Sequence, residues 1–175
     1  MTRIVLLGFM GSGKTTVGHQ LAASLGIPFY DLDWYIEMRY HRTVAQLFDE
    51  RGEEGFRQLE HNMLHEVAEF ENIVLSCGGG TPCYADNMTY LNSLAETVYL
   101  KAEPEVLSAH LDMSRVERPL LRGKNPEERL LFIRQSLLER EPYYAQAKHT
   151  FDVSLLDNRQ KIKLTVQLLR EELGV

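Results

Sequence analysis

A glycine-rich segment near the start of the chain constrains its fold more than any other feature. Residues 4–7 form a short apolar run, and the pattern G-x-x-x-x-G-K-T follows at once over residues 8–15. The glycines of this pattern let the backbone close around an anion, so that successive N–H groups point at phosphate oxygens. The helix that begins here aims the positive end of its dipole at the same phosphates. The segment therefore predicts a strand, a phosphate-binding loop (P-loop) and a helix that bind a nucleotide.

Length, charge and cysteine content narrow the class of protein. The 175 residues suit one domain, and the formal net charge of −6 argues against a general nucleic-acid binder. The spacing of Cys77 and Cys83 fits neither C-x-x-C nor a zinc pattern. The first apolar run is too short for a secretion signal, and no stretch approaches membrane-spanning length. We expect a cytosolic protein in which both cysteines are small buried residues.

Strand and helix signals alternate along the chain, which indicates an α/β fold with a parallel sheet. The five predicted strands cover residues 3–8, 28–31, 72–76, 96–101 and 150–154. The predicted helices cover residues 14–25, 33–40, 43–52, 53–70, 86–94 and 126–141, with two more that begin at Pro104 and Asp157. We expect one doubly wound P-loop domain over residues 1–175, with helices on both faces of a five-stranded sheet.

Residues 113–125 differ from the rest of the chain. The segment is polar and basic, is interrupted by Pro119 and Gly123, and lacks a clear period. These features predict a mobile lid between two parts of the core, residues 1–112 and 126–175.

In doubly wound sheets, ligands bind beyond the carboxyl ends of the strands. Asp31 and Asp33 follow the second predicted strand, and Gly78–Gly80 follow the third. Asp31 can support Mg²⁺ through a water, and Asp33 can accept a proton or a hydrogen bond from an attacking hydroxyl. The alternative is a helix N-cap with a surface acid, and Asp33 can also serve as both cap and catalyst.

Two arginines lie in predicted helices. Arg57 precedes Glu60 by three residues, and Arg140 is flanked by two glutamates. Each alone is typical of a solvated charge or of a pair with a nearby acid. Together they match the geometry of a substrate carboxylate. Gly78–Gly80 can place bare N–H groups beside that substrate, although a tight turn after a strand explains three glycines equally well.

The predicted lid carries Arg118, within the sequence Arg-Pro-Leu-Leu. A charge on a lid can close over the phosphates and stabilise charge that develops during transfer. The alternative is a solvated loop arginine, which is our interpretation of Arg122 and Lys124.

His61 and His65 are four residues apart, on one face of a predicted helix. This spacing can bind a metal, but the segment lacks the glutamate of a zinc-protease helix. We interpret the histidines as a surface pair or a satisfied core pair.

These motifs together resemble those of the shikimate kinases, in the nucleoside-monophosphate-kinase-like branch of the P-loop fold. The matching segments are residues 8–15, 29–33 (Phe-Tyr-Asp-Leu-Asp), 52–60, 78–80 and 118–121, and Arg140 with Tyr143. The P-loop alone is shared with many kinases. The combination of Asp-x-Asp, Phe-Arg-x-x-Glu, triple glycine and Arg-Pro-Leu is far more restrictive.

The resemblance implies a nucleotide site around the P-loop. Lys14 would bind the ATP phosphates, Thr15 would coordinate Mg²⁺, and Asp31 would support the ion through a water. Arg118 would reach ATP from the lid and act with Lys14 in catalysis, while Arg115 is a weaker candidate for stacking on adenine. The loop residues that hold the phosphates would be Gly11, Ser12, Gly13, Lys14, Thr15 and Thr16.

The resemblance also implies an acceptor site. Asp33 would bind a ring hydroxyl of shikimate and act as the catalytic base, Arg57 and Arg140 would clamp the carboxylate, and Gly79 would donate its N–H to a hydroxyl. The implied reaction moves the γ-phosphoryl group of ATP to the 3-hydroxyl of shikimate, giving shikimate 3-phosphate on the route to chorismate. We expect a cytoplasmic monomer whose partners are ATP, Mg²⁺ and shikimate, with no nucleic acid and no membrane.

The chain departs from the family pattern at His41 and at residues 81–83, and its adenine-side loop near Asn158 and Arg159 is not diagnostic. These places bear on base recognition more than on the reaction. Two alternatives stay open. A kinase of an open-chain acid such as gluconate shares the P-loop and the size, and a nucleotide-sensing module would bind ATP without transfer.

Overall fold

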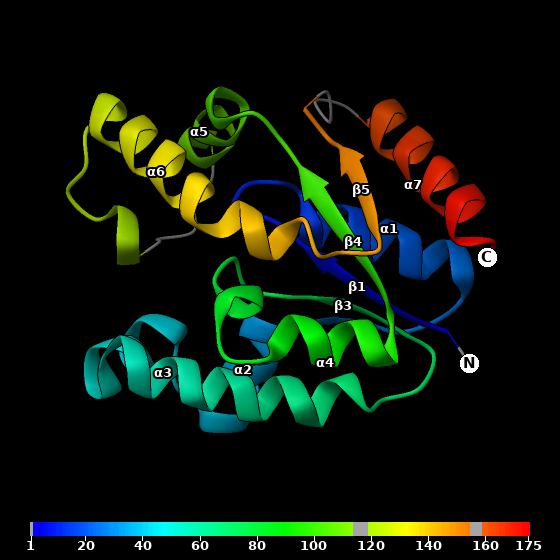
Figure 1. The fold of residues 1–175 in the computed structure, drawn as a ribbon, viewed down its shortest axis with the longest axis horizontal. Helices are drawn as coiled ribbons and strands as arrows, with labels where there is room; N and C mark the ends of the chain where they lie inside the picture. Colours follow the sequence, from blue (N-terminus) through cyan, green and yellow to red (C-terminus); the bar gives the residue numbers. More distant parts are fainter. Residues whose placement is uncertain (1, 114–118, 155–158) are drawn as a thin grey trace.

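The sheet of this protein is parallel throughout. The computed structural model describes residues 2–113, 119–154 and 159–175. Within these ranges five strands pair in the order β2-β3-β1-β4-β5 (Figure 1). Their bounds are β1 Arg3–Leu7, β2 Phe29–Asp31, β3 Ile73–Ser76, β4 Glu96–Lys101 and β5 His149–Asp152. The predicted five-stranded parallel sheet is confirmed.

Seven α-helices and two short 3₁₀ helices surround the sheet in the described ranges. The α-helices are α1 Lys14–Leu25, α2 Leu32–Tyr40, α3 Val44–Ala68, α4 Asn87–Leu94, α5 Pro104–Met113, α6 Pro126–Tyr144 and α7 Arg159–Leu173, and the 3₁₀ helices are η1 Thr81–Cys83 and η2 Pro119–Leu121. In these ranges no helix is both long and apolar enough to cross a bilayer.

Alternate residues of β1 face opposite halves of the core. Val5 and Leu7 pack with buried side chains of α2, α3 and α4. Ile4 and Leu6 pack with buried side chains of α1, α5, α6 and α7. Because successive side chains of a strand point to opposite faces, both faces of the sheet are covered, as Figure 1 shows for α3 and α4 on one side and α5 and α7 on the other. This is the doubly wound arrangement expected for a parallel sheet.

The register of the central strands brings three loops together. Asp31 at the end of β2 pairs with Ser76 at the end of β3, and Ser76 pairs with Leu6 of β1. The chain therefore leaves all three strands at one edge of the sheet. The P-loop, Asp31 and the Gly78–Gly80 turn start there.

The α3 helix consists of two helical stretches that meet at a kink, where the sequence predicts the boundary between two helices. It runs from Val44 to Ala68, with one non-helical residue at Gly52, where φ is 70° and ψ is 176°. A capping box is present at its start, with Thr43 accepting from the Gln46 N–H and the Gln46 side chain accepting from the Thr43 N–H. Gly52 adopts this non-helical backbone at low steric cost, so the chain changes direction between the two helical stretches.

The α6 helix continues past Pro142, where we predicted its end. It reaches Tyr144, and the next N–H, of Ala145, donates to Glu141 O at 2.9 Å. A proline removes only its own N–H donor from the helix and clashes with one preceding carbonyl. Tyr144 is fully buried, and its burial holds the last turn in place.

Other predictions concern turns and caps. His41 ends α2 in the left-handed conformation (φ 51°). A glycine would adopt this backbone with less strain. Cys77 is buried and Cys83 is half-buried, and both thiols are free.

Part of the predicted lid, residues 114–118, and the predicted helix start at Asp157 lie outside the described residues. Residues 119–121 form η2 rather than a plain loop.

Candidate active site

The P-loop adopts the backbone shape that its glycines permit. Gly8, Gly11 and Gly13 have φ of 146°, 84° and 88°. A Cβ on Gly8 would lie 2.6 Å from the carbonyl oxygen of Leu100, so a larger residue cannot fit. Helix α1 begins at Lys14 without a side-chain cap. Its first N–H groups therefore stay available to an anion, as a phosphate site requires.

Lys14 lies inside this loop. Its Nζ donates to the carbonyl oxygens of Gly8 and Phe9, both at 2.9 Å, and the side chain is buried. The hydroxyl of Ser12 is also buried and has no hydrogen-bond partner among the described residues. An ammonium and an unused hydroxyl in the curl of the loop are groups that a phosphate can engage.

Thr15 and Asp31 meet at the mouth of the loop. Thr15 Oγ1 donates to Asp31 Oδ2 at 3.0 Å. The other carboxylate oxygen of Asp31 accepts from the N–H groups of Asp33 (3.1 Å) and Trp34 (3.3 Å), which makes Asp31 the N-cap of α2. The possible cap role of Asp33 is therefore wrong. A hydroxyl beside a carboxylate is the hard-oxygen donor set that suits Mg²⁺ with several of its waters.

The turn after β3 gathers three charged side chains. A Cβ on Gly78 would lie 3.2 Å from Asp33 Oδ1, and one on Gly79 would lie 3.2 Å from Arg140 Nη1. A Cβ on Gly80 would lie 2.3 Å from Arg57 Nη2. Gly78–Gly80 have no positive φ. These glycines are therefore needed for close approach, and they bring Asp33, Arg57 and Arg140 around one turn.

Arg57 is held by a buried acid. Its Nη1 donates to Glu60 Oε2 at 2.6 Å, and the exposed fractions of the two side chains are 12% and 1%. Glu60 Oε1 accepts from Thr81 Oγ1 at 2.6 Å. The pairing with Glu60 that the spacing predicted is present, but inside the protein instead of on its surface. A buried, fully bonded glutamate fixes the guanidinium in one position.

Arg140 is half-buried, and one of its guanidinium nitrogens lacks a partner in the part of the chain that the structure describes. Its guanidinium lies over the Phe9 ring, 5.2 Å from the centroid. Its Nη1 is buried and has no hydrogen-bond partner among the described residues. Leaving a buried charged donor unpaired costs about 1–3 kcal/mol or more. An anionic group bound beside Gly79 would remove that cost.

Tyr144 contacts the turn at Gly78–Gly80, and the sequence analysis did not predict this contact. Its hydroxyl donates to Gly79 O at 2.5 Å, and burial raises the pKa of this phenol, so it remains a donor. The resemblance to the shikimate kinases includes Arg140 with the neighbouring Tyr143, but Tyr143 is exposed. The predicted end of α6 at Pro142 left no reason to place Tyr144 in the core.

Glu60 was noted only as a partner of Arg57. A usable signal was present, because Phe56, Glu60 and Leu64 are spaced four apart and so share one face of α3. All three are buried.

The remaining predicted residues divide into two groups. Thr15 and Thr16 are exposed in the first turn of α1, beside Gly11 and Gly13 of the loop. Arg115 and Arg118 lie outside the described residues, as does Asn158. A Cβ on Gly79 would lie 3.2 Å from Arg140 Nη1 and 3.5 Å from the backbone nitrogen of Met10, so the P-loop and the predicted acceptor residues meet at the turn after β3.

Comparison with known proteins agrees with this arrangement. A sequence profile described as shikimate kinase matches residues 10–170. A shikimate kinase of Bacteroides thetaiotaomicron is 53% identical over 171 residues, which cover 98% of each chain.

Two crystal structures are similar over nearly the whole chain. A shikimate kinase from Bacteroides thetaiotaomicron has a TM-score of 0.97 at 52% identity, covering 99% of both chains. A shikimate kinase from Acinetobacter baumannii in complex with shikimate has a TM-score of 0.84 at 34% identity, covering 99% of this chain and 94% of the other.

Proposed function

Because this chain belongs to the shikimate kinase family, we propose that it transfers the γ-phosphoryl group of ATP to the 3-hydroxyl of shikimate. The observation that carries the acceptor assignment is the unpaired, buried N–H of Arg140 beside Gly79. Arg57 lies beside the neighbouring Gly80, so the two guanidinium groups would bind a planar carboxylate between them.

The nucleotide side supplies charge and position. The N–H groups of the P-loop and Lys14 hold the phosphates, with Gly11, Ser12, Gly13 and Thr16 around them. Thr15 would ligate Mg²⁺ directly and Asp31 would do so through water, an assignment supported by their 3.0 Å contact. When bound, Mg²⁺ neutralises charge on the β- and γ-phosphate oxygens. Lys14 would then stabilise the charge that moves to the leaving ADP.

Asp33 is the proposed base. The 3-hydroxyl oxygen forms a bond to the γ-phosphorus while the bond from that phosphorus to the β–γ bridging oxygen breaks. The electron pair leaves with ADP, and the hydroxyl proton passes to the Asp33 carboxylate. Gly79 would donate its N–H to another hydroxyl of the ring, which fixes the acceptor in line with ATP.

The lid has a proposed role that rests on the family. Residues 113–125 would close over ATP, Arg118 would add positive charge to the phosphates, and Arg115 would stack on adenine. We also propose that the protein works as a cytoplasmic monomer with ATP, Mg²⁺ and shikimate as its ligands and with no nucleic-acid or membrane partner.

One assay tests the proposal against both alternatives. ADP release is measured with ATP, Mg²⁺ and either shikimate or gluconate. We expect rapid turnover with shikimate and at most a trace with gluconate. Preference for gluconate would assign the site to an open-chain acid. ATP binding without turnover on any hydroxylated acid would instead indicate a nucleotide-sensing module.

A further inference from the structure

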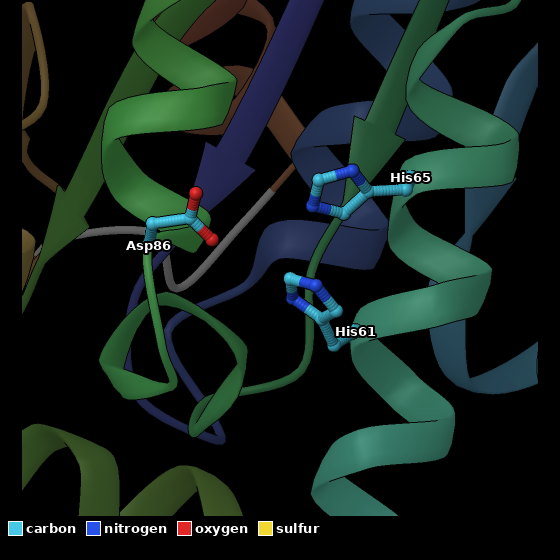
Figure 2. Close-up of side chains that lie close together, drawn as sticks. All are labelled: His61, His65 and Asp86. Atoms are coloured by element: carbon cyan, nitrogen blue, oxygen red, sulfur yellow. The ribbon is translucent and has the colours of Figure 1, made fainter.

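Three potential metal ligands from two segments lie together on the face of the protein that α3 and α4 cover. His61 and His65 project from α3, and Asp86 lies just before α4, opposite them (Figure 2). One ligand atom from each residue lies within 4.8 Å of the other two. The i, i+4 spacing placed the histidines on one helix face, but Asp86 joins them only in the fold.

A buried amide sets the proton position on His61. Asn87 is fully buried, and its Nδ2 donates to Thr81 O at 2.7 Å. Its oxygen therefore faces His61 Nδ1, at 2.6 Å, and must accept from it. The proton is on Nδ1, which leaves a lone pair on Nε2. Histidines that bind metals are typically oriented in this way, with the second ring nitrogen donating to a fixed oxygen.

His65 is held between two rings. It stacks on Tyr90 at 3.7 Å with an interplanar angle of 10°, and it lies 4.3 Å from the His61 ring. Its Nε2 is buried and has no hydrogen-bond partner among the described residues. An unused imidazole nitrogen in this position is poorly explained by packing alone.

Asp86 supplies a carboxylate that no helix cap uses. It occupies the N-cap position of α4, yet its side chain makes no cap hydrogen bond, and the residue is exposed. An aspartate at this position ordinarily accepts from the first turn of its helix. The carboxylate is thus available to a ligand on the side of the two histidines.

We propose that His61, His65 and Asp86 bind a divalent transition-metal ion of the Zn²⁺ class, with water completing a tetrahedral shell. Two imidazoles and one carboxylate favour this class over Mg²⁺ or Ca²⁺, which prefer oxygen ligands. Donors about 2.0–2.1 Å from the ion lie about 3.3 Å apart, so rotation of these side chains closes the site. The ion would link α3 to the start of α4, and it is separate from the Mg²⁺ proposed at Thr15 and Asp31.

The test uses the full chain without a polyhistidine tag, freed of metal by a chelator. Zn²⁺ is titrated calorimetrically, and Co²⁺ serves as a spectroscopic probe. We expect one ion per chain, a rise in melting temperature with Zn²⁺, and visible Co²⁺ absorption of tetrahedral type. His61→Ala and His65→Ala should each weaken binding by at least about 10-fold and remove the Co²⁺ bands. Asp86→Asn should weaken binding less.

The matched control is His41→Asn, which removes an exposed histidine at the end of α2 with a residue that tolerates its left-handed backbone. It should bind Zn²⁺ as the parent does. Absence of stoichiometric binding to the parent, or unchanged binding to His61→Ala and Asp86→Asn, would overturn the proposal. Because Asp86 is exposed, Asp86→Asn should fold, so its Zn²⁺ affinity tests the proposal even if His65→Ala fails to fold. None of these readouts depends on turnover of shikimate.

Discussion

The nucleotide side and the acceptor side of the proposed site are built by different means. The nucleotide side is mostly backbone from one continuous segment, residues 8–16, whose glycines adopt positive φ. The acceptor side is made of side chains from α2, α3 and α6 around the turn at Gly78–Gly80. The comparison shows that a site for a common group such as phosphate can be local in sequence. A site for one particular acceptor depends on tertiary packing.

The first prediction addresses the nucleotide side. Lys14→Met should lower turnover by about 10³-fold or more, because the variant loses the charge opposite the phosphates. The fold should persist, since methionine fills a similar buried space. ADP release and circular dichroism measure the two effects. Turnover like that of the parent would show that Lys14 does not act on phosphate.

The second prediction concerns the two arginines of the acceptor side. Arg57→Ala and Arg140→Ala should each weaken shikimate binding by roughly 30-fold or more while ATP binding changes little. Calorimetry with each ligand measures this. Equal losses for both ligands would contradict the carboxylate clamp.

The two arginine variants should differ in their free energies of unfolding. Arg57→Ala leaves Glu60 buried without its cation, which is expected to cost about 3–5 kcal/mol of unfolding free energy. Arg140→Ala removes a donor that is already unpaired, so its cost should stay near 1 kcal/mol. Chemical denaturation compares the pair, and similar losses would mean that Arg140 has a structural partner.

The third prediction tests the glycine turn. In Gly80→Ala the added Cβ would lie 2.3 Å from Arg57 Nη2, so Arg57 must shift, and KM for shikimate should rise on the order of 10-fold. The control is Gly26→Ala, where φ is +67° and a Cβ meets nothing within 4 Å. It should lower stability through backbone strain without changing KM. An unchanged KM in Gly80→Ala would separate the turn from the acceptor site.

The smallest expected effect lies outside both regions. Burial lowers the pKa of His149, but hydrogen bonds to Glu172 and Glu96 outweigh it and leave the pKa above 6.5. The charged ring therefore stabilises the fold fully below about pH 6.5, and this contribution is lost as pH rises through the raised pKa. His149→Gln should cost under about 1 kcal/mol at pH 5.5 and less at pH 8.5. Thermal melts at both values check it, and a larger loss at high pH would refute the assignment.

The same contrast explains what could be predicted from sequence. The P-loop and the strands were predicted correctly because spacing, apolar runs and glycines act over short distances. The placement of Asp31 beside Thr15 followed from parallel-sheet topology. The burial of Glu60 and the contact of Tyr144 with Gly79 could not be derived in the same way, because each depends on which face of a helix meets the core.

The passage of α6 through Pro142 has the same origin. Tertiary burial outweighed the local preference of one residue. The meeting of Asp86 with His61 and His65 could not be predicted either, since no local pattern connects α3 with the start of α4.

The clamp of Arg57 and Arg140 on a carboxylate is the central claim, and one binding cycle tests it most directly. Shikimate and its uncharged methyl ester are titrated into the parent protein and into Arg140→Ala. The clamp predicts that the parent prefers the acid strongly and that the variant loses most of this preference, a coupling of about 1.5 kcal/mol or more. If parent and variant discriminate between acid and ester equally, Arg140 does not hold the carboxylate.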